Sequence, residues 1–569
     1  TTTAARTVGF DKYDFVAGVG GNTHFNLGAD IHRSPVSIFG LNALYAGGYQ
    51  GVVVGNTHMY AGGGLHYDVF GGASNADIYG YAETFVGSDR FGRFTNNLQL
   101  RHCVYGGNDF GGQILGTGTH TILKANPDGT TTTQDVTSNT FVKYLGGNVE
   151  RSIFGGSCGL YRYRDTYINN TGEEMTVTIG SQEYKLAANA EVPLYPQESD
   201  LVDVKGVKLA NSWESMPTLF TDLMGEYNDE TNTYANPNNY NIVVDIACEN
   251  EVTPNVANGI MSNQIFANIY GGGYGYCDET GRVDAHNTYV NLHGPENGTQ
   301  HLAENVFGGG YFSYVEHSKV DAYSGLFRNI YGGTYGTTVD AGVSAINHAQ
   351  LVAQAATQTS TWGTEFDPNE YQVLEEIDAT QLKEADYTGL TAEVNVYPKL
   401  TANSGVNIYG AGSYTGVDET VVNLYGGLVN EVYGGSKNEG VCRNTLVNVP
   451  AGSKISMAAL YGGAYGSYPA LPCDVRNATI RFSSSDAIVR DGMIFGGNNN
   501  CRATHNAVIN YDAKAKDSNG EYLTLFGAGN GQNSVAGNAH VFVSGSSILK
   551  NIYGGSQAGR AEGCRLRPD

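Results

Sequence analysis

The sequence predicts an all-β fold, a parallel β-helix or β-solenoid that carries an inserted β-rich subdomain and lateral loops. Three observations support this fold class. Glycine accounts for 78 of the 569 residues, roughly twice its usual share of about 7%. A short unit of an aliphatic residue, an aromatic residue and two glycines recurs along the chain. A β-branched unit with asparagine recurs between its copies. Alternating strand and turn units of this kind are typical of stacked coils.

The first recurring unit is interpreted as a short strand followed by a corner. Copies include Ile269-Tyr270-Gly271-Gly272 and Val432-Tyr433-Gly434-Gly435, and from Tyr433 onward the aromatic residue returns at 461, 495, 526 and 553. Uneven spacing suits a solenoid because extra residues leave a coil as loops. We expect the glycine pair to adopt positive φ and turn the chain, and the aromatic rings to stack as a structural ladder. The predicted ladder contains Tyr270, Phe307, Tyr331, Tyr409, Tyr425, Tyr433, Tyr461, Phe495, Phe526 and Tyr553.

The second recurring unit supplies a β-branched strand. It reads Asn287-Thr288-Tyr289-Val290-Asn291 and Asn444-Thr445-Leu446-Val447-Asn448, with weaker copies near 477, 506 and 538. β-Branched and aromatic residues favour strands, and asparagines at matching positions can join their amides from coil to coil. Each coil is therefore expected to hold two strands joined by turns.

Interruptions of these units divide the chain into segments. Residues 117–146 are predicted to form a polar hairpin with Asn126-Pro127-Asp128-Gly129 as its turn, and residues 174–180 and 183–186 a second hairpin. Helix is expected only within 201–227 and 345–356. The predicted segments are an N-terminal cap or exchange arm (1–39), a first solenoid section with the hairpin (40–159), an inserted β-rich subdomain (160–262), a solenoid section (263–339), an acidic lateral insertion (340–400) and a C-terminal solenoid (401–569).

Charge and hydropathy exclude several classes of partner. Acidic residues outnumber basic ones by 56 to 32, which gives a formal net charge of −24 and argues against binding of nucleic acid through its phosphates. No run of 18 apolar residues occurs, so no membrane-spanning helix is expected. The opening TTTAAR lacks both a methionine and a signal-peptide core. We interpret the chain as an exported product whose signal has been removed.

The eight cysteines are predicted to form disulfides, since an even number in an exported chain favours them. The alternative is that they are free, buried core residues. No C-x-x-C pair occurs, which argues against a zinc ribbon. Eight cysteines allow 105 pairings, and Cys564 could instead bond a neighbouring subunit. The pairing that we expect is Cys103–Cys158, Cys248–Cys277, Cys442–Cys473 and Cys501–Cys564.

The repeated aliphatic-aromatic-Gly-Gly unit resembles the "VFGG"-type repeats of large secreted surface proteins of anaerobic bacteria. The resemblance covers roughly residues 40–115, 145–160 and 265–560. It implies a cell-surface or extracellular β-repeat and no catalytic residues. The composition is also similar to that of sheath and filament proteins of prokaryotes, and residues 160–262 lie outside both patterns.

The sequence offers no catalytic or cofactor-binding constellation. Glycoside hydrolysis needs two carboxylates facing one cleft, whereas the acidic groups here, Asp278-Glu279, Asp418-Glu419 and Glu375-Glu376-Asp378, are interpreted as solvated turn residues. The segment from Gly272 to Asp278 approaches a calcium-binding repeat, so a single loop-bound calcium is allowed, but no other cofactor. The 13 histidines are scattered, and no metal site is predicted.

A second set of tyrosines follows the glycines and could form an exposed stripe for glycans or proteins. These are Tyr274, Tyr276, Tyr311, Tyr335, Tyr414, Tyr465 and Tyr468. From these observations we expect an extracellular structural protein that assembles with itself into a filament, sheath or layer, because a solenoid has open edges. The alternatives are a surface adhesin or glycan-binding module, and a polysaccharide lyase or hydrolase.

Overall fold

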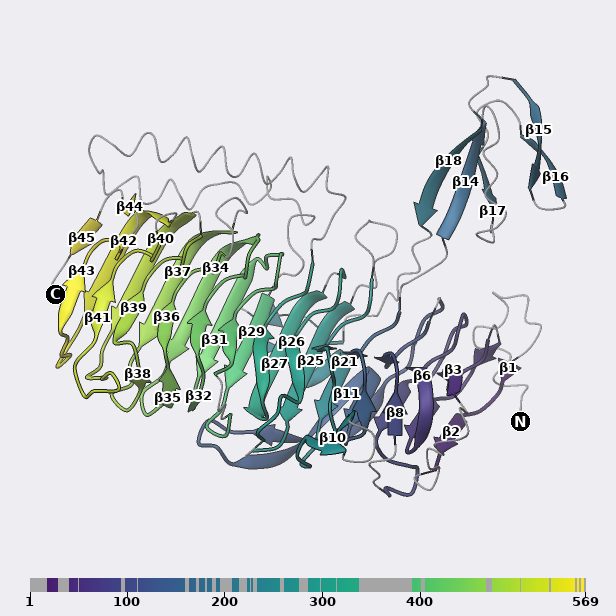
Figure 1. The fold of residues 1–569 in the computed structure, drawn as a ribbon, viewed down its shortest axis with the longest axis horizontal. Helices are drawn as coiled ribbons and strands as arrows, with labels where there is room; N and C mark the ends of the chain where they lie inside the picture. Colours follow the sequence, from purple (N-terminus) through teal and green to yellow (C-terminus); the bar gives the residue numbers. More distant parts are fainter. Residues whose placement is uncertain are drawn as a thin grey trace.

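The computed structural model confirms the predicted fold class: the chain forms a coil of stacked parallel strands. It describes most of residues 18–158, 239–336 and 391–566, together with short strands between 163 and 234. Residues 1–17, 29–39, 276–284 and 337–390 are the main segments left out. In Figure 1 the strands stack along the long axis of the coil, from the N-terminal strands to β43 at the opposite end. Within the described ranges every regular element is a strand, and no helix there is long and apolar enough to cross a membrane.

Two long sheets form the walls of the coil, and each coil adds one rung to each. Sheet I runs through β2 (Thr23–Leu27), β5 (Thr57–Ala61), β7 (Ala82–Val86), β11 (Thr131–Tyr144), β21 (Asn239–Ile246), β25 (Ala285–His293), β27 (Val315–Ser324), β29 (Thr391–Val396), β31 (Glu419–Leu424), β34 (Gly440–Val449), β37 (Cys473–Phe482), β40 (Ala503–Tyr511), β42 (Val535–Val543) and β44 (Arg560–Ala561), with β45 (Cys564–Leu566) also paired to β42.

Sheet II contains the aromatic-glycine units. Its strands are β3 (Gly40–Tyr45), β6 (Gly64–Phe70), β8 (Leu98–Leu100), β9 (Val104–Tyr105), β12 (Asn148–Val149), β13 (Ile153–Phe154), β24 (Asn268–Tyr270), β26 (Ala303–Phe307), β28 (Phe327–Tyr331), β30 (Asn407–Tyr409), β33 (Glu431–Tyr433), β36 (Ala459–Tyr461), β39 (Met493–Phe495), β41 (Thr524–Phe526) and β43 (Asn551–Tyr553). A third, short parallel sheet joins β32 (Gly426–Leu428), β35 (Lys454–Met457) and β38 (Ile488–Val489).

The interior of the coil is filled by aliphatic side chains from both sheets. Val290 and Leu292 of sheet I and Val306 and Ile330 of sheet II are all fully buried in one cluster. Successive residues of a strand face opposite sides, so the aliphatic residue of each unit points inward and the aromatic residue after it points outward. The two recurring units of the sequence are therefore the two walls of each coil.

Two kinds of side structure leave the coil. The hairpin predicted for 117–146 is confirmed: β10 (Gly118–Ala125) pairs antiparallel with β11, and Gly129 N donates to Asn126 O at 2.9 Å in its turn. Figure 1 shows this hairpin running along the lower side of the coil. The hairpin of β15 (Met175–Ile179) and β16 (Gln182–Leu186) was also predicted. It lies apart from the coil with the antiparallel strands β14 (Tyr163–Asn169), β17 (Glu191–Leu194) and β18 (Val207–Trp213).

The remaining short strands pair locally. They are β1 (Gly18–Val19) with β4 (Val52–Val53), β19 (Tyr227–Asn228) with β20 (Thr233–Tyr234), and β22 (Thr253–Asn255) with β23 (Ile260–Ser262).

The structure differs from the predicted segments at three boundaries. β2 lies within the predicted N-terminal cap, β21 within the predicted insertion 160–262, and β29 within the predicted acidic insertion, yet all three are rungs of sheet I. These three strands are not among the recognised copies of the β-branched unit that forms later rungs of sheet I. Strand β18 replaces part of the helix predicted within 201–227, and the helix predicted within 345–356 lies outside the described residues.

The glycine pair has a different role from the one predicted. Positive φ occurs instead five residues after the aromatic residue, for example at Phe312 (47°), Tyr414 (63°) and Gly336 (93°). The paired glycines are needed because coils approach closely: a Cβ on Gly308 would lie 2.2 Å from the carbonyl oxygen of Gly332 in the next coil. The corner therefore follows the glycines rather than lying on them.

Candidate functional site

A single stack of aromatic rings runs the length of the outer face of sheet II. Consecutive ring centroids are 4.5–5.1 Å apart, and neighbouring planes differ by at most 13°. From Phe70 to Phe526 the rings are almost completely buried. The thirteen rings, one per rung, belong to Tyr45, Phe70, Tyr105, Phe154, Tyr270, Phe307, Tyr331, Tyr409, Tyr433, Tyr461, Phe495, Phe526 and Tyr553. We call this stack the aromatic ladder.

Tyr425 was predicted in the ladder, and this prediction is wrong. Its segment, Leu424-Tyr425-Gly426-Gly427, copies the repeating unit, but Leu424 ends β31 of sheet I and Gly426 begins β32. The Tyr425 ring therefore stacks on Tyr397, 5.4 Å away, at the end of the preceding rung of sheet I.

Asparagine ladders lie beside the aromatic rings. On sheet II, Asn305 donates to Asn268 at 2.8 Å, Asn329 to Asn305 at 2.7 Å and Asn407 to Asn329 at 3.1 Å. On sheet I, Asn477, Asn506 and Asn538 continue a similar series from Asn444. Each amide uses one donor and one acceptor along the coil axis, so these ladders fix the register of the rungs.

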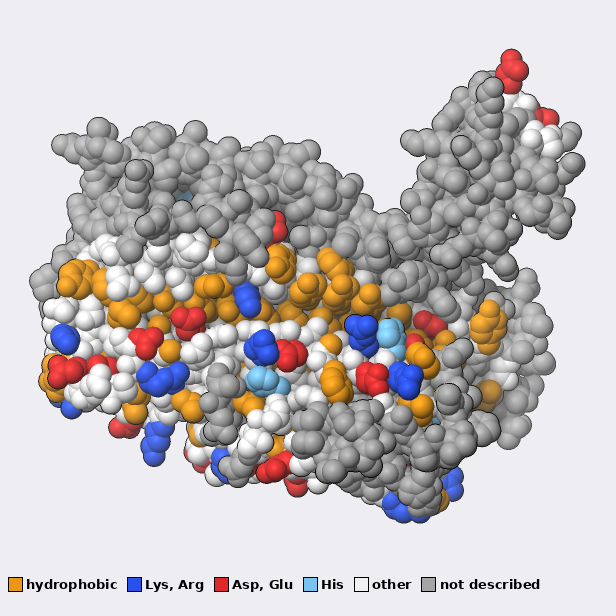
Figure 2. All heavy atoms as spheres, in the orientation of Figure 1, with side chains coloured by type: hydrophobic (Ala, Val, Ile, Leu, Met, Phe, Trp, Pro, Cys, Tyr) orange, Lys and Arg blue, Asp and Glu red, His pale blue; other side chains and the backbone are white. Residues whose placement is uncertain are grey.

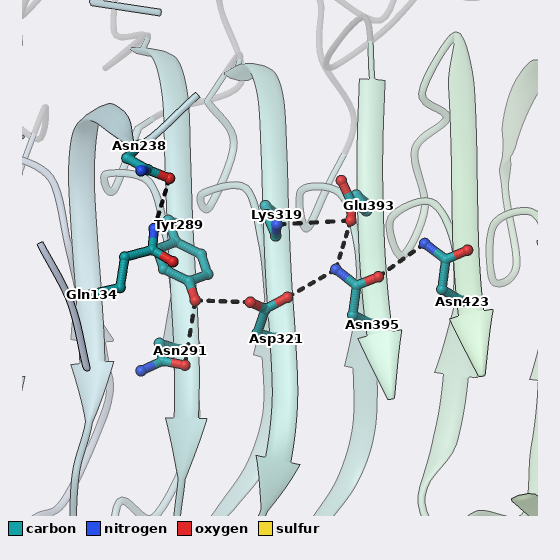
Figure 3. A network of polar contacts seen from close by, with 9 residues as sticks. All are labelled: Gln134, Asn238, Tyr289, Asn291, Lys319, Asp321, Glu393, Asn395 and Asn423. Carbon is teal, nitrogen blue, oxygen red and sulfur yellow. Dashed lines mark hydrogen bonds and ion pairs between the residues drawn. The ribbon is translucent and has the colours of Figure 1, made fainter. Parts of the chain in front are cut away.

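A partly buried network of charged and amide groups lies on sheet I (Figure 3). Tyr289 OH donates to Asp321 Oδ2 at 2.8 Å, and Asn395 donates to Asp321 Oδ1 at 2.8 Å. Asp321 and Glu393 hold the pKa of Lys319 well above its usual range. The Lys319 ammonium lies 3.8 Å from Glu393. Lys319 offsets one of the two carboxylates, and the network continues the asparagine ladder to Asn423, so we assign it a structural role.

A cavity of about 490 Å³ opens between the hairpin and the coil. The hairpin contributes Leu123 and Thr131, and strand β25 contributes its last residue, His293. The turns after β21 and β25 contribute Glu249, Glu251 and Glu296 among others. The ring of His293 packs against Tyr323, which also lines the cavity, at 4.7 Å. The Glu296 carboxylate is 2.9 Å from the Lys399 ammonium.

Part of the predicted tyrosine stripe forms a second, more exposed stack. Tyr274 and Tyr311 stack at 4.7 Å, and Tyr311 and Tyr335 at 5.2 Å, with all three rings half-buried. Tyr414 meets Tyr335 edge to face, and Tyr465 packs against the aromatic ladder at Tyr433. Tyr276 and Tyr468 lie outside the described residues. Figure 2 shows hydrophobic side chains, a class that includes tyrosine, gathered in a band along the long axis of the face drawn.

The C-terminal end of the aromatic ladder differs from its middle. At the C-terminal rung, β43 exposes Ile552 by 38% and Tyr553 by 50%. One rung earlier, the equivalent Leu525 and Phe526 are exposed by 0% and 7%. The surface at this end therefore exposes both an aliphatic residue of the interior and a ring of the aromatic ladder.

The cysteines form a different pattern from the predicted pairing. Cys473 and Cys501 form a disulfide with a Cα–Cα distance of 5.8 Å. Cys103, Cys248 and Cys442 are buried, and none of the three takes part in a disulfide. Burial raises the pKa of the Cys248 and Cys442 thiols to about 12. The predicted pairs Cys442–Cys473 and Cys501–Cys564 are therefore wrong.

Strand register explains these corrections. Cys442 lies beside Val475, and Gly440 beside Cys473, so Cys442 and Cys473 are offset by two residues. Cys564 lies beside Ala539 of β42, which separates it from β40 and Cys501. Cys103 and Cys158 are not bonded to each other, because Ser152 rather than Cys158 is the neighbour of Cys103 in the register of β9 and β13. Cys248 is not bonded to Cys277, which lies outside the described residues.

Of the three acidic groups considered as catalytic candidates, only Asp418-Glu419 lies within the described residues. Arg443 contacts both Asp418, at 2.7 Å, and Glu419, at 3.2 Å. The solvated-turn interpretation does not hold for this pair, because the Asp418 side chain is only 15% exposed and Glu419 begins strand β31. Asp278-Glu279 and Glu375-Glu376-Asp378 lie outside the described residues, and so does Asp278 of the calcium-like segment.

One cluster contains none of the residues predicted to form a binding site. Asp68, His102 and Cys103 bring a carboxylate oxygen, a ring nitrogen and a sulfur within 4.8 Å of one another. Hydrogen bonds with Asp68 and Cys103 raise the pKa of His102 to about 10. The neighbours Tyr45 and Asp109 are joined by a 2.6 Å hydrogen bond, and burial raises the pKa of Asp109 to about 6. Asp68 and His102 are 34 residues apart in the chain, so no local motif reveals the cluster.

Comparisons with protein-family models, with curated proteins and with solved structures found no match.

Proposed function

We propose that this chain is an extracellular structural protein whose coils stack end to end, so that copies assemble into a filament, sheath or layer. The observation that carries this proposal is the exposed C-terminal rung. Exposure of Ile552 and Tyr553 leaves apolar surface in water beside a strand edge that pairs with no further described strand. Open edges with apolar side chains favour pairing with another chain.

The opposite end of sheet II offers a matching edge. Among the described strands, β3 pairs only with β6 and β43 only with β41. All rungs of sheet II are parallel, so a second copy placed along the coil axis would add β3 to β43 in the same direction. The ladder would then continue from Tyr553 to Tyr45 of the next copy. A head-to-tail contact of this kind is heterologous and repeats without closing.

Two further observations support an extracellular location. The Cys473–Cys501 disulfide suits an oxidising compartment. The net charge of −24 favours solubility of a large surface with few charged residues.

Sedimentation velocity over a range of concentrations tests the assembly. The wild-type chain should form species larger than a monomer as concentration rises. The variant Ile552→Lys places a charge on the open end and should remain monomeric. Phe266→Lys is the matched control, because Phe266 is also exposed by 38% but lies on the side of the coil. Equal assembly of the two variants would contradict the proposal, as would a monomeric wild-type chain.

Glycan binding is a second candidate function, and the half-buried stack of Tyr274, Tyr311 and Tyr335 favours it. Aromatic faces and edges along a groove bind sugar rings through apolar contact, with polar groups fixing orientation. Binding of polysaccharides by the wild-type chain should be lost in Tyr311→Ala and kept in Tyr425→Ala, whose ring lies elsewhere. Binding that survives Tyr311→Ala unchanged would exclude the stripe as the binding surface.

A further inference from the structure

The position two residues before each ring of the aromatic ladder faces the same outer side of sheet II. In four central coils this position is asparagine, and the amides of Asn268, Asn305, Asn329 and Asn407 join in the ladder described above. In two coils near the N-terminus the same position holds Asp68 and Cys103. Val69 pairs with Val104 and Phe70 with Tyr105, so Asp68 and Cys103 are direct neighbours on adjacent rungs.

His102 completes a cluster at this break in the ladder. Its Nδ1 is 2.7 Å from Asp68 Oδ1, and the backbone N–H of Cys103 donates to the same oxygen at 3.1 Å. The three side chains are positioned from two adjacent coils, and one ligand atom from each lies within 4.8 Å of the others. Cys103 is buried, whereas the side chains of His102 and Asp68 are exposed by 49% and 23%. The sulfur thus forms the floor of the cluster, and the imidazole forms the side open to solvent.

We propose that Asp68, His102 and Cys103 form a binding site for a divalent transition-metal ion of the zinc type. Thiolate, imidazole and carboxylate are the three protein groups that bind zinc. Calcium and magnesium prefer all-oxygen sites, so a sulfur and a nitrogen ligand select a softer ion. This site is independent of the end-to-end assembly, because it lies on the side of the coil.

At the contact between His102 and Asp68, only a small adjustment is needed to hold such an ion, and the Cys103 sulfur lies within 4.8 Å of both ligand atoms. Zinc bonds to nitrogen and oxygen are about 2.0 Å long, which puts two tetrahedral ligands about 3.3 Å apart. His102 Nδ1 and Asp68 Oδ1 must therefore separate by roughly half an ångström from their present 2.7 Å. The half-exposed His102 ring can turn by this amount without disturbing the rungs. With three protein ligands the fourth position faces solvent and can take water.

Cobalt(II) is a suitable probe because a cobalt–thiolate bond absorbs in the near ultraviolet and four-coordinate cobalt absorbs strongly in the visible. The full chain is treated with chelator, titrated with cobalt and then with zinc. We expect both absorptions to appear and saturate at a single equivalent of cobalt, and to disappear when zinc displaces it. Cys103→Ser should lose the thiolate absorption, and Asp68→Asn and His102→Gln should each weaken binding at least about tenfold.

Two controls separate this site from other groups. Cys442→Ser removes another buried thiol that is in no disulfide, and His286→Ala removes a histidine paired with Glu316 at 2.5 Å. Both should bind cobalt like the wild-type chain. If Cys103→Ser fails to fold, judged by near-ultraviolet circular dichroism, Asp68→Asn and His102→Gln still decide, since their side chains are partly exposed. Absence of the thiolate absorption in the wild-type chain would overturn the proposal. Unchanged affinity in both Asp68→Asn and His102→Gln would do the same.

Discussion

The close approach of coils at the glycine pair gives a sharp prediction for Gly308→Ala. The new Cβ would lie 2.2 Å from Gly332 O, whereas ordinary contact begins near 3.4 Å, so the two coils must separate locally by about 1.2 Å. That movement breaks two hydrogen bonds between the coils, from Gly308 N to Tyr331 O at 2.9 Å and from Gly309 N to Gly333 O at 3.1 Å. Each buried group left unpaired costs about 1–3 kcal/mol. We expect a local loss of about 3 kcal/mol or more.

Hydrogen exchange followed by mass spectrometry is the assay, because a solenoid can open in parts rather than in one transition. Amides within 303–336 should exchange at least about a hundredfold faster in Gly308→Ala than in the wild-type chain. Gly298→Ala is the matched control, since its Cβ would meet nothing closer than 3.6 Å. Equal protection in the two variants would refute the packing argument.

Three further predictions concern stability. Burial lowers the pKa of His505 to about 4 from an ordinary 6.5. Between pH 6.5 and 4 the unfolded chain binds a proton at this side chain more readily than the folded chain does. The free energy of unfolding should therefore be unaffected by His505 above pH 6.5 and fall by about 3 kcal/mol as the pH drops toward 4. Thermal melts of the wild-type chain should show a steeper acid loss than those of His505→Gln, and parallel curves would contradict this. The Cys473–Cys501 disulfide closes a loop of 28 residues and should contribute about 3–4 kcal/mol. Reductant should therefore lower the melting temperature of the wild-type chain but not that of a Cys473→Ser/Cys501→Ser double variant, and equal responses would count against the bond. Phe307→Ala removes a ring buried between Tyr270 and Tyr331 and should cost about 3–5 kcal/mol. In chemical denaturation, Tyr425→Ala, which lies outside the ladder, should lower the free energy of unfolding much less than Phe307→Ala. Similar losses in the two variants would contradict a stabilising role of the ladder.

The fold was predictable because a local sequence pattern, repeated along the chain, specifies its strands. The aliphatic residue of each unit fills the interior and the aromatic residue stacks outside, and both roles follow from the alternation of a strand. The hairpin turn at 126–129 was predictable for the same reason, since its residues favour a turn by themselves.

The errors arose where register, rather than local sequence, decides the outcome. Tyr425 has the same local sequence as a ladder residue, but it follows a strand of sheet I. The pairing of Cys473 with Cys501 rather than Cys442 depends on an offset of two residues between β34 and β37. Asp68 and Cys103 are neighbours only because two coils stack. Predicting which residues of two coils meet depends on the lengths of the loops between their strands. The repeating units do not specify these lengths.

Electron microscopy of the assembled protein gives a direct test of end-to-end stacking. The fifteen described strands of sheet II form thirteen rungs, because β8 and β9 share one rung and β12 and β13 share another. The described path of sheet I has fourteen rungs, and rungs of a sheet are about 4.8 Å apart. If copies stack with continuous sheets, filaments should show an axial repeat of about 60–70 Å with a 4.8 Å spacing between strands. Filaments with a different repeat, or only dispersed particles at high concentration, would contradict end-to-end stacking.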